Sequence, residues 1–313
     1  MTAATDGCSR DSGKMRMSEF YLTDEEKLVF SLRSLWKKSG YSFIRVSSAE
    51  EYDFYVRNKE FLPGRGVITF TDADGTLMAL KSDVTLSLVK KLKDDERGVQ
   101  RLMYNEKIYR IPRFSSSFRE IEQTGLECLG DLTEKEIAEA VLLGEKSLSL
   151  IGGRTFLAVS HMGIINHILE GVGAEDRETL ISLVEKRKTE DILRLSKTVE
   201  SLEKPCSLFL GLLDPGKTNE ETIAFLSSNG FPSGAVSELE AVVREVGNVV
   251  FDFSSLGAFG YYNGIIFKGY AEGLSRPVLQ GGEYSLLLRR INRRMKRGVG
   301  FAVYMDEMEE KER

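Results

Sequence analysis

The sequence is poor in the residues on which many catalytic sites depend. Its 313 residues include two histidines, His161 and His167, and three widely spaced cysteines, Cys8, Cys128 and Cys206. So few histidines disfavour a histidine-rich metal site and leave little room for Ser-His-Asp or Cys-His catalysis. An odd number of cysteines without a CxxC pair disfavours a disulfide framework and indicates a reducing cytoplasm. We expect no metal and no cofactor, structural roles for both histidines, and a core thiol at Cys128.

Long apolar runs and a strong net charge are also missing. No stretch approaches the ~18 apolar residues that a membrane-spanning helix needs, and the first 20 residues lack the apolar core of a signal peptide. The 48 Asp and Glu residues outnumber the 43 Lys and Arg residues, and a net charge of −5 disfavours a dedicated nucleic-acid binder. The length predicts a globular protein of about two domains.

Capping signals and periodicity locate the first elements. Capping boxes that begin at Thr23 and Thr133 predict a helix over 22–39 and another that reaches about Leu150. A further helix is predicted over 82–95. Between these helices, two β-like segments flank a polar loop and predict an antiparallel hairpin: 99–111 and 119–130.

The second half of the sequence alternates in character. Helical patterns cover 176–203, which Pro205 is expected to end, and continue at 219–228 and 237–245. β-like segments then return: 248–254, 260–270 and 299–305. This order predicts an α+β core with an insertion. The expected parts are a loose tail (1–17), the core (18–170 and 246–313) and a mostly helical insertion subdomain (171–245).

The segment GLLDPGKT (211–218) matches the pattern of a phosphate-binding P-loop. Against this reading, Pro215 removes a backbone amide that would cradle phosphate, and Asp214 brings a negative charge towards it. We therefore favour a strand-to-helix turn in which Gly216 interrupts the regular secondary structure and Thr218 is the N-cap of the helix.

The densest basic run is RRINRRMKR (289–297). It could contact nucleic acid or another anionic partner. Helical spacing, however, places Leu288, Ile291 and Met295 on one face, which favours a buried stripe with solvated arginines around it.

Five segments occur in an order that carries more information than either motif: ALKSDVTLSLVKK (79–91), YNEKIYRIPRFSSSFREIEQTGLECLG (104–130), FGYYNGIIF (259–267), GGEY (281–284) and GVGFAVYMDEM (298–308). Together they resemble the catalytic core of class II aminoacyl-tRNA synthetases, specifically the histidyl-tRNA synthetase branch. KSDVT is similar to the RPEGT-like strand end, the long second segment to motif 2, GYYNG to the DYYTG-type histidine motif, and the last two segments to motif 3. The resemblance covers roughly residues 20–170 and 245–308. It implies an antiparallel sheet flanked by helices.

The departures from that family's pattern bear on catalysis. Formation of an aminoacyl-adenylate needs cations on the triphosphate and on the charge that develops at the α-phosphate. The motif 3 arginine falls at Glu307, the arginine of GGRYD at Glu283, and the arginine and aspartate around DYYTG at Gly257 and Gly260. The motif 2 carboxylate falls at Pro112. We therefore expect no catalytic residues and no adenylation.

The polar groups that would hold an amino acid persist. By the resemblance they form a histidine-binding site: Asp83, Thr85, Arg110, Gln123, Glu127, Tyr261 and Tyr262. Asp83 and Glu127 can bind an ammonium or an imidazole N–H, with Thr85 and Gln123 completing the lining. The two tyrosines offer aromatic walls, and Arg110 can pair with a carboxylate. The GYYNG segment departs from DYYTG at Asn263 as well as at Gly260.

Loss of the adenylation groups beside a retained pocket implies the ATP phosphoribosyltransferase regulatory subunit family, whose members have the synthetase-like core without an anticodon-binding domain. The resemblance then implies several partners. A short-form catalytic phosphoribosyltransferase subunit is activated, histidine acts as a feedback effector, and a homodimer sits within a hetero-oligomer. It also implies a cytoplasmic protein with no tRNA and no membrane partner.

Two enzymatic alternatives remain open at this point. A divergent amino-acid-activating enzyme would need replacement cations, for which Arg289, Arg290 and Arg293 are the candidates. A nucleotide hydrolase would rely on Lys217 in the GLLDPGKT segment.

Overall fold

The computed structural model describes residues 22–62, 66–92, 98–111, 117–256, 261–291 and 296–309. No helix in these ranges is long and apolar enough to cross a membrane.

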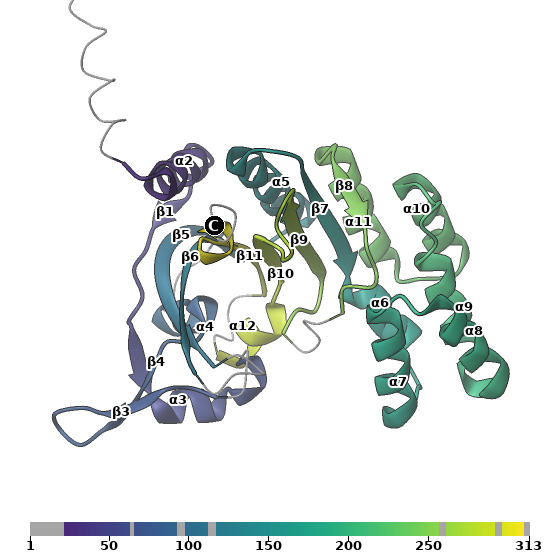
Figure 1. Ribbon diagram of the computed structural model, residues 1–313, viewed down its shortest axis with the longest axis horizontal. Helices are drawn as coiled ribbons and strands as arrows, with labels where there is room; N and C mark the ends of the chain where they lie inside the picture. The colour runs from purple at the N-terminus through teal and green to yellow at the C-terminus, as the bar shows by residue number, and fades with distance from the viewer. Residues whose placement is uncertain are drawn as a thin grey trace, which may run out of the picture.

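An eight-stranded sheet forms the centre of the molecule (Figure 1). Its strands, from edge to edge, are β1 (Ser42–Phe43), β5 (Gln100–Arg110), β6 (Arg119–Gly130), β11 (Arg297–Tyr304), β10 (Leu279–Glu283), β9 (Ile265–Ala271), β7 (Thr155–His161) and β8 (Val249–Phe251). The six inner strands pair antiparallel. Only the edge strands run parallel to their neighbours, β1 to β5 and β8 to β7. The predicted hairpin is confirmed as β5 and β6.

Two helices cover one face of the sheet: α2 (Asp24–Lys38) and α5 (Glu134–Ile151). Both begin at the predicted capping boxes, on Thr23 and Thr133. The buried Trp36 indole donates a hydrogen bond to the Ser147 hydroxyl (3.0 Å) and meets the Phe301 ring edge-on. Cys128 lies in this core, as expected. This face of the sheet is therefore closed by packing.

The opposite face carries a second, smaller core. It is covered by α4 (Val84–Lys91) and α12 (Ser285–Ile291), which lie below the sheet in Figure 1. A small three-stranded sheet adjoins it, with α3 (Tyr52–Arg57) and the short helix η1 (Lys59–Phe61). The strands of this sheet lie in the order β2 (Ala49–Glu51), β4 (Leu77–Leu80) and β3 (Thr69–Thr71). The chain's polar site residues gather on this side.

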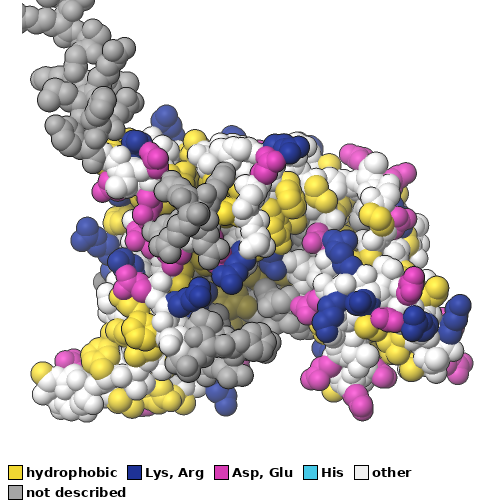
Figure 2. Space-filling model, in the orientation of Figure 1, with side chains coloured by type: hydrophobic (Ala, Val, Ile, Leu, Met, Phe, Trp, Pro, Cys, Tyr) yellow, Lys and Arg dark blue, Asp and Glu magenta, His cyan; other side chains and the backbone are white. Residues whose placement is uncertain are grey.

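A helical segment extends to one side of the sheet (Figure 1). It contains α6 (Met162–Ile168), α7 (Ala174–Glu185), α8 (Thr189–Thr198), η2 (Glu200–Leu202), α9 (Glu203–Leu212), α10 (Asn219–Ser228) and α11 (Ser233–Glu245). The helical character of the insertion is thus present, while its boundaries at 171 and 245 stay a prediction. Figure 2 shows acidic and basic side chains intermingled over α7 and α8, with no single-sign patch there.

The helical segment also protects the β8 edge of the large sheet. The Asn219 side chain donates to the Val249 carbonyl (2.9 Å) and accepts from the Phe251 N–H (3.3 Å). An amide side chain thereby occupies backbone groups that would otherwise be open to another strand.

Three expectations about elements are wrong. Pro205 does not end a helix but lies in the first turn of α9, where a missing N–H costs nothing. The chain before Lys217 is helical, so the GLLDPGKT segment joins two helices and follows no strand. Strand β9 begins at Ile265, so Tyr261 and Tyr262 lie in the turn before it.

Candidate functional site

The candidate site begins at the N-terminus of α4. Asp83 is the N-cap of this helix, and its Oδ1 accepts a hydrogen bond from the Leu86 N–H (2.8 Å). The next six residues, 84–89, are all buried, which fixes the helix against the sheet. The helix start therefore places Asp83 beside Arg110 of β5 and Thr85 beside Glu127 of β6.

Glu127 is the acceptor at the centre of the site. On β6 it is 2% exposed; its Oε1 accepts from the Thr85 hydroxyl (2.6 Å) and its Oε2 from the Tyr284 hydroxyl (2.6 Å). Burial raises the pKa of the Glu127 carboxyl to about 8, although both hydrogen bonds lower it, and the charge of Asp83 adds to the rise. The empty site therefore holds a proton on Glu127 at neutral pH.

Asp83 is the second buried carboxyl group, and it has a cationic partner. Arg110 donates through Nη2 to Asp83 Oδ2 (3.5 Å) and through Nε to the Ser82 carbonyl (2.9 Å). The Tyr261 hydroxyl donates to Asp83 Oδ1 (3.3 Å). Burial raises the pKa of Asp83, and Arg110 only partly offsets this. Arg110 is thus engaged by Asp83 and keeps only its remaining N–H groups for a ligand.

Tyrosine rings and glycines shape the space around the carboxyl groups. Tyr261 and Tyr262 meet edge-on with ring centroids 4.9 Å apart. A Cβ on Gly282 would lie 2.8 Å from the Tyr262 ring, and one on Gly300 would lie 1.8 Å from Glu127 Oε2. Larger residues at these two strand positions would displace the aromatic wall and the central carboxyl group.

Gln123 lies two pleats from Glu127 on β6, so its side chain is on the same face of the sheet. It is 3% exposed, so its surface is almost wholly covered by the protein. Gln123 therefore lies on the same side of the sheet as the buried carboxyl group of Glu127.

A charge network joins this site to the helical segment. Arg297, at the start of β11, contacts Glu283 (2.5 Å) and Glu238 of α11 (2.6 Å), and Glu238 also contacts His161 Nε2 (3.1 Å). Burial would raise the pKa of Glu238, but His161 and Arg297 outweigh it and hold that pKa below its usual range. The Glu283 carbonyl in turn accepts from the Asn263 N–H (2.9 Å), next to Tyr262.

The two acidic residues at the family's arginine positions are both paired. Glu283 is held by Arg297, and Glu307 contacts Arg276 (3.2 Å). Each of these two family arginine positions is therefore occupied by a carboxylate that an arginine from elsewhere in the chain neutralises. The other three departures, Pro112, Gly257 and Gly260, lie outside the described residues.

The competing motifs have structural roles in the described chain. The Lys217 ammonium donates to the Gly211 carbonyl (2.6 Å) and sits over the Phe225 ring, while Thr218 forms a capping box for α10. Leu288, which precedes the basic run and was expected on its apolar face, is buried. Met295, expected on the same face, lies outside the described residues. The expectation of solvated arginines is wrong for Arg297, whose side chain is 25% exposed and ion-paired. Arg290 pairs with Glu60, and Arg293 is also outside the described ranges.

The structure brings the residues predicted for the pocket together on one face of the sheet. Hydrogen bonds join Thr85 to Glu127 and both Arg110 and Tyr261 to Asp83. Sequence reasoning missed Tyr284, although it ends the quoted GGEY segment, and it missed Arg297 inside the basic run. Among the described residues no group of three or more His, Cys, Asp or Glu side chains could hold a metal.

This antiparallel sheet, with helices on both faces and buried carboxyl groups on one of them, is the class II aminoacyl-tRNA synthetase fold. A family model described as histidyl-tRNA synthetase matches residues 20–308. The chain therefore belongs to the histidyl-tRNA synthetase family.

Individual relatives include regulatory proteins and enzymes. An ATP phosphoribosyltransferase regulatory subunit of Lactococcus lactis is 24% identical over 307 residues, covering 95% of each chain. A histidine–tRNA ligase of Archaeoglobus fulgidus is 25% identical over 269 residues, covering 82% of this chain and 64% of its own. A chain of the ATP phosphoribosyl transferase complex from Thermotoga maritima superposes with a TM-score of 0.71 at 20% identity, covering 91% and 98%. The chain resembles the regulatory subunits within the synthetase-like family.

We predict that the Glu127 carboxyl group makes the free energy of unfolding fall as the pH rises. Because the folded pKa is about 8 and the unfolded model value is 4.5, its contribution is present below pH 4.5 and is lost as pH rises to about 8. The loss is on the order of 5 kcal/mol, from about 1.4 kcal/mol for each unit of pKa. In Glu127→Gln, denaturant unfolding between pH 5 and 9 should lack this fall.

Glu120→Gln provides the control on the same strand, since Glu120 is exposed and paired with Lys107. It should keep the wild-type decline. Equal pH profiles for Glu127→Gln and the wild type would contradict the assignment.

A second prediction concerns Arg297. Arg297→Met leaves Glu283 and Glu238 buried without their cation, which should lower the free energy of unfolding by about 3 kcal/mol. Arg276→Met removes the exposed pair with Glu307 and should cost less than about 1 kcal/mol. Chemical denaturation at pH 7 measures both, and equal costs would show that the network is not a buried ionic link.

Proposed function

We propose that this protein is the non-catalytic regulatory subunit of an ATP phosphoribosyltransferase, which binds histidine at the site described above. The observation that carries the proposal is a buried cluster of two carboxyl groups beside two tyrosine rings, with the arginines around it engaged by carboxylates. Arg110 is bound to Asp83, Arg297 to Glu283 and Glu238, and Arg276 to Glu307. Such a site suits an ammonium and an imidazole far better than a triphosphate.

Each group of histidine has a complementary partner in the proposed complex. The Glu127 carboxyl, protonated when the site is empty, can pass its proton to the imidazole and form a charge-assisted pair with it. The α-ammonium would meet Asp83 and the Gln123 carbonyl oxygen, and the carboxylate would meet N–H groups of Gln123 and Arg110. Tyr261 and Tyr262 would pack against the ring.

The names of the relatives indicate the partner protein in this proposal. Curated relatives named ATP phosphoribosyltransferase regulatory subunit cover most of this chain, and a similar chain occurs in an ATP phosphoribosyl transferase complex. The partner is therefore a short-form catalytic subunit, with a homodimer of this chain inside the hetero-oligomer. Histidine would act by favouring one arrangement of the subunits, and by linkage the partner must then change the affinity for histidine by the same factor.

Titration calorimetry and native mass spectrometry test the proposal. Histidine should bind saturably, and Glu127→Gln should weaken it by roughly tenfold or more because a charge-assisted hydrogen bond is lost. Glu120→Gln should leave the affinity unchanged. The protein should associate with a short phosphoribosyltransferase subunit, and that subunit should shift the affinity for histidine.

Separate failures have separate meanings. No histidine binding, or equal weakening by both variants, would reject the pocket. No association with the catalytic subunit would reject the regulatory role.

A further inference from the structure

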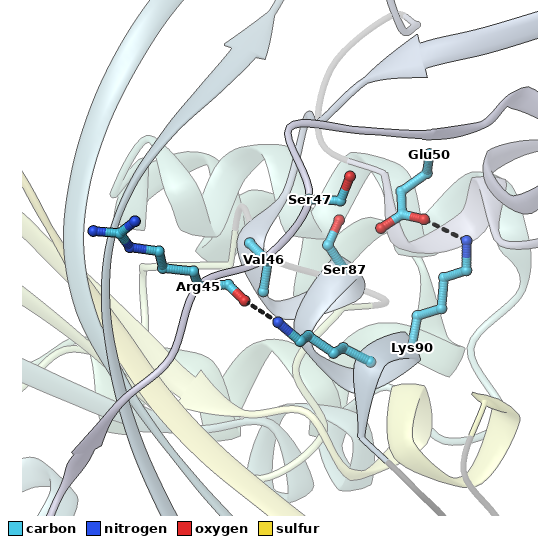
Figure 3. Close-up of a pocket in the computed structure, with 7 residues that line it drawn as sticks. Arg45, Val46, Ser47, Glu50, Ser87 and Lys90 are labelled. Carbon is cyan, nitrogen blue, oxygen red and sulfur yellow. Dashed lines mark hydrogen bonds and ion pairs between the residues drawn. The ribbon is translucent and has the colours of Figure 1, made fainter.

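A cavity lies at the opposite end of α4 from Asp83. Its volume is about 480 Å³, in the range of sites for small molecules. It is lined by Arg45, Val46, Ser47, Glu50, Ser87, Lys90 and Lys91. The segment 45–50 forms one wall and the C-terminal half of α4 the other (Figure 3).

Two lysines and one carboxylate, Glu50, direct their side chains to the cavity, whereas Arg45 contributes its backbone carbonyl. Lys90 is committed to that carboxylate and also lies over the Phe54 ring. Among the described residues the Lys91 ammonium donates only to the neutral Arg45 carbonyl (2.5 Å), and no carboxylate in that part of the chain pairs with it. Lys91 is therefore available to an anion.

Hydroxyl groups lie between the charged walls. Ser87 is 1% exposed, and its Oγ has no hydrogen-bond partner among the described residues. In Figure 3 the Ser87 side chain points towards Ser47, with Glu50 beside it, while the Ser47 hydroxyl is turned away from Ser87 and the Arg45 side chain extends away. The Ser47 hydroxyl donates to the Ala49 carbonyl (2.6 Å). A buried hydroxyl such as that of Ser87 is costly unless a ligand or water satisfies it.

We propose that this cavity binds a small phosphorylated metabolite with free hydroxyl groups, such as a sugar phosphate. Lys91 holds the phosphate, because its ammonium has a neutral partner that an anion readily replaces. Glu50 and the two serines hydrogen-bond the hydroxyls of the ligand. The site is separate from the histidine pocket and goes beyond the proposed regulatory function, since it requires neither histidine nor a partner subunit.

Calorimetry on the full-length protein with ribose 5-phosphate and with inorganic phosphate tests the site. Ribose 5-phosphate should bind saturably and more tightly than phosphate, because only the sugar reaches Glu50 and the serines. Lys91→Gln should weaken binding at least roughly tenfold through loss of a charge-assisted hydrogen bond. Lys38→Gln, the same charge change at the exposed end of α2, should leave it unchanged.

Ser87→Ala separates binding from packing. Removing an unpaired buried hydroxyl should preserve or raise the melting temperature while it weakens binding of ribose 5-phosphate. Equal weakening by Lys91→Gln and Lys38→Gln would show non-specific attraction and overturn the proposal. The proposal would also be overturned if Asp83→Asn abolished binding of ribose 5-phosphate and Lys91→Gln did not, because the ligand would then lie at the Asp83 site. If no phosphate compound binds but Lys91→Gln weakens association with an acidic protein partner, the cavity is a docking site instead.

Discussion

Burial of two carboxyl groups on one face of the sheet is the constraint on which the site depends. Asp83 caps α4 and is held by Arg110, whereas Glu127 receives only neutral hydroxyl donors, from Thr85 and Tyr284. Without a cation, Glu127 stays protonated at neutral pH. In the proposed complex, a ligand with a basic nitrogen, such as imidazole, would take this proton and pair with the carboxylate. Gly300 makes the arrangement possible because a side chain there would occupy the space of the Glu127 carboxyl group.

The arginines around this region are paired with carboxylates. Arg297 is paired with Glu283 and Glu238, and Arg276 with Glu307. The first of these contacts also ties α11 of the helical segment to the strands beside the pocket. A change at the pocket therefore has a direct polar route to the helical segment, which is a requirement of any regulatory coupling through this fold.

Local signals in the sequence predicted much of this structure, and contacts between distant segments account for what it missed. The capping boxes at Thr23 and Thr133 and the β5–β6 hairpin are local patterns, and all are confirmed. Period-two spacing placed Gln123 and Glu127 on one face. No local pattern reveals that Glu238 reaches His161 and Arg297, 77 and 59 residues away. Strand β10 was missed because its glycines weaken the β-like signal, and Tyr284 was missed because only the folded sheet brings it to Glu127.

The central claim is that this synthetase fold binds an amino acid without activating it. Of the described candidates for replacement cations, Arg290 is paired with Glu60 and Arg289 is exposed on α12. Lys217, the candidate for nucleotide hydrolysis, donates to the Gly211 carbonyl before α10. The most direct test is the histidine-dependent exchange of radiolabelled pyrophosphate into ATP, at a histidine concentration that saturates binding in calorimetry. The account predicts no exchange above background for wild-type protein. Exchange that depends on histidine and disappears in Glu127→Gln would contradict it.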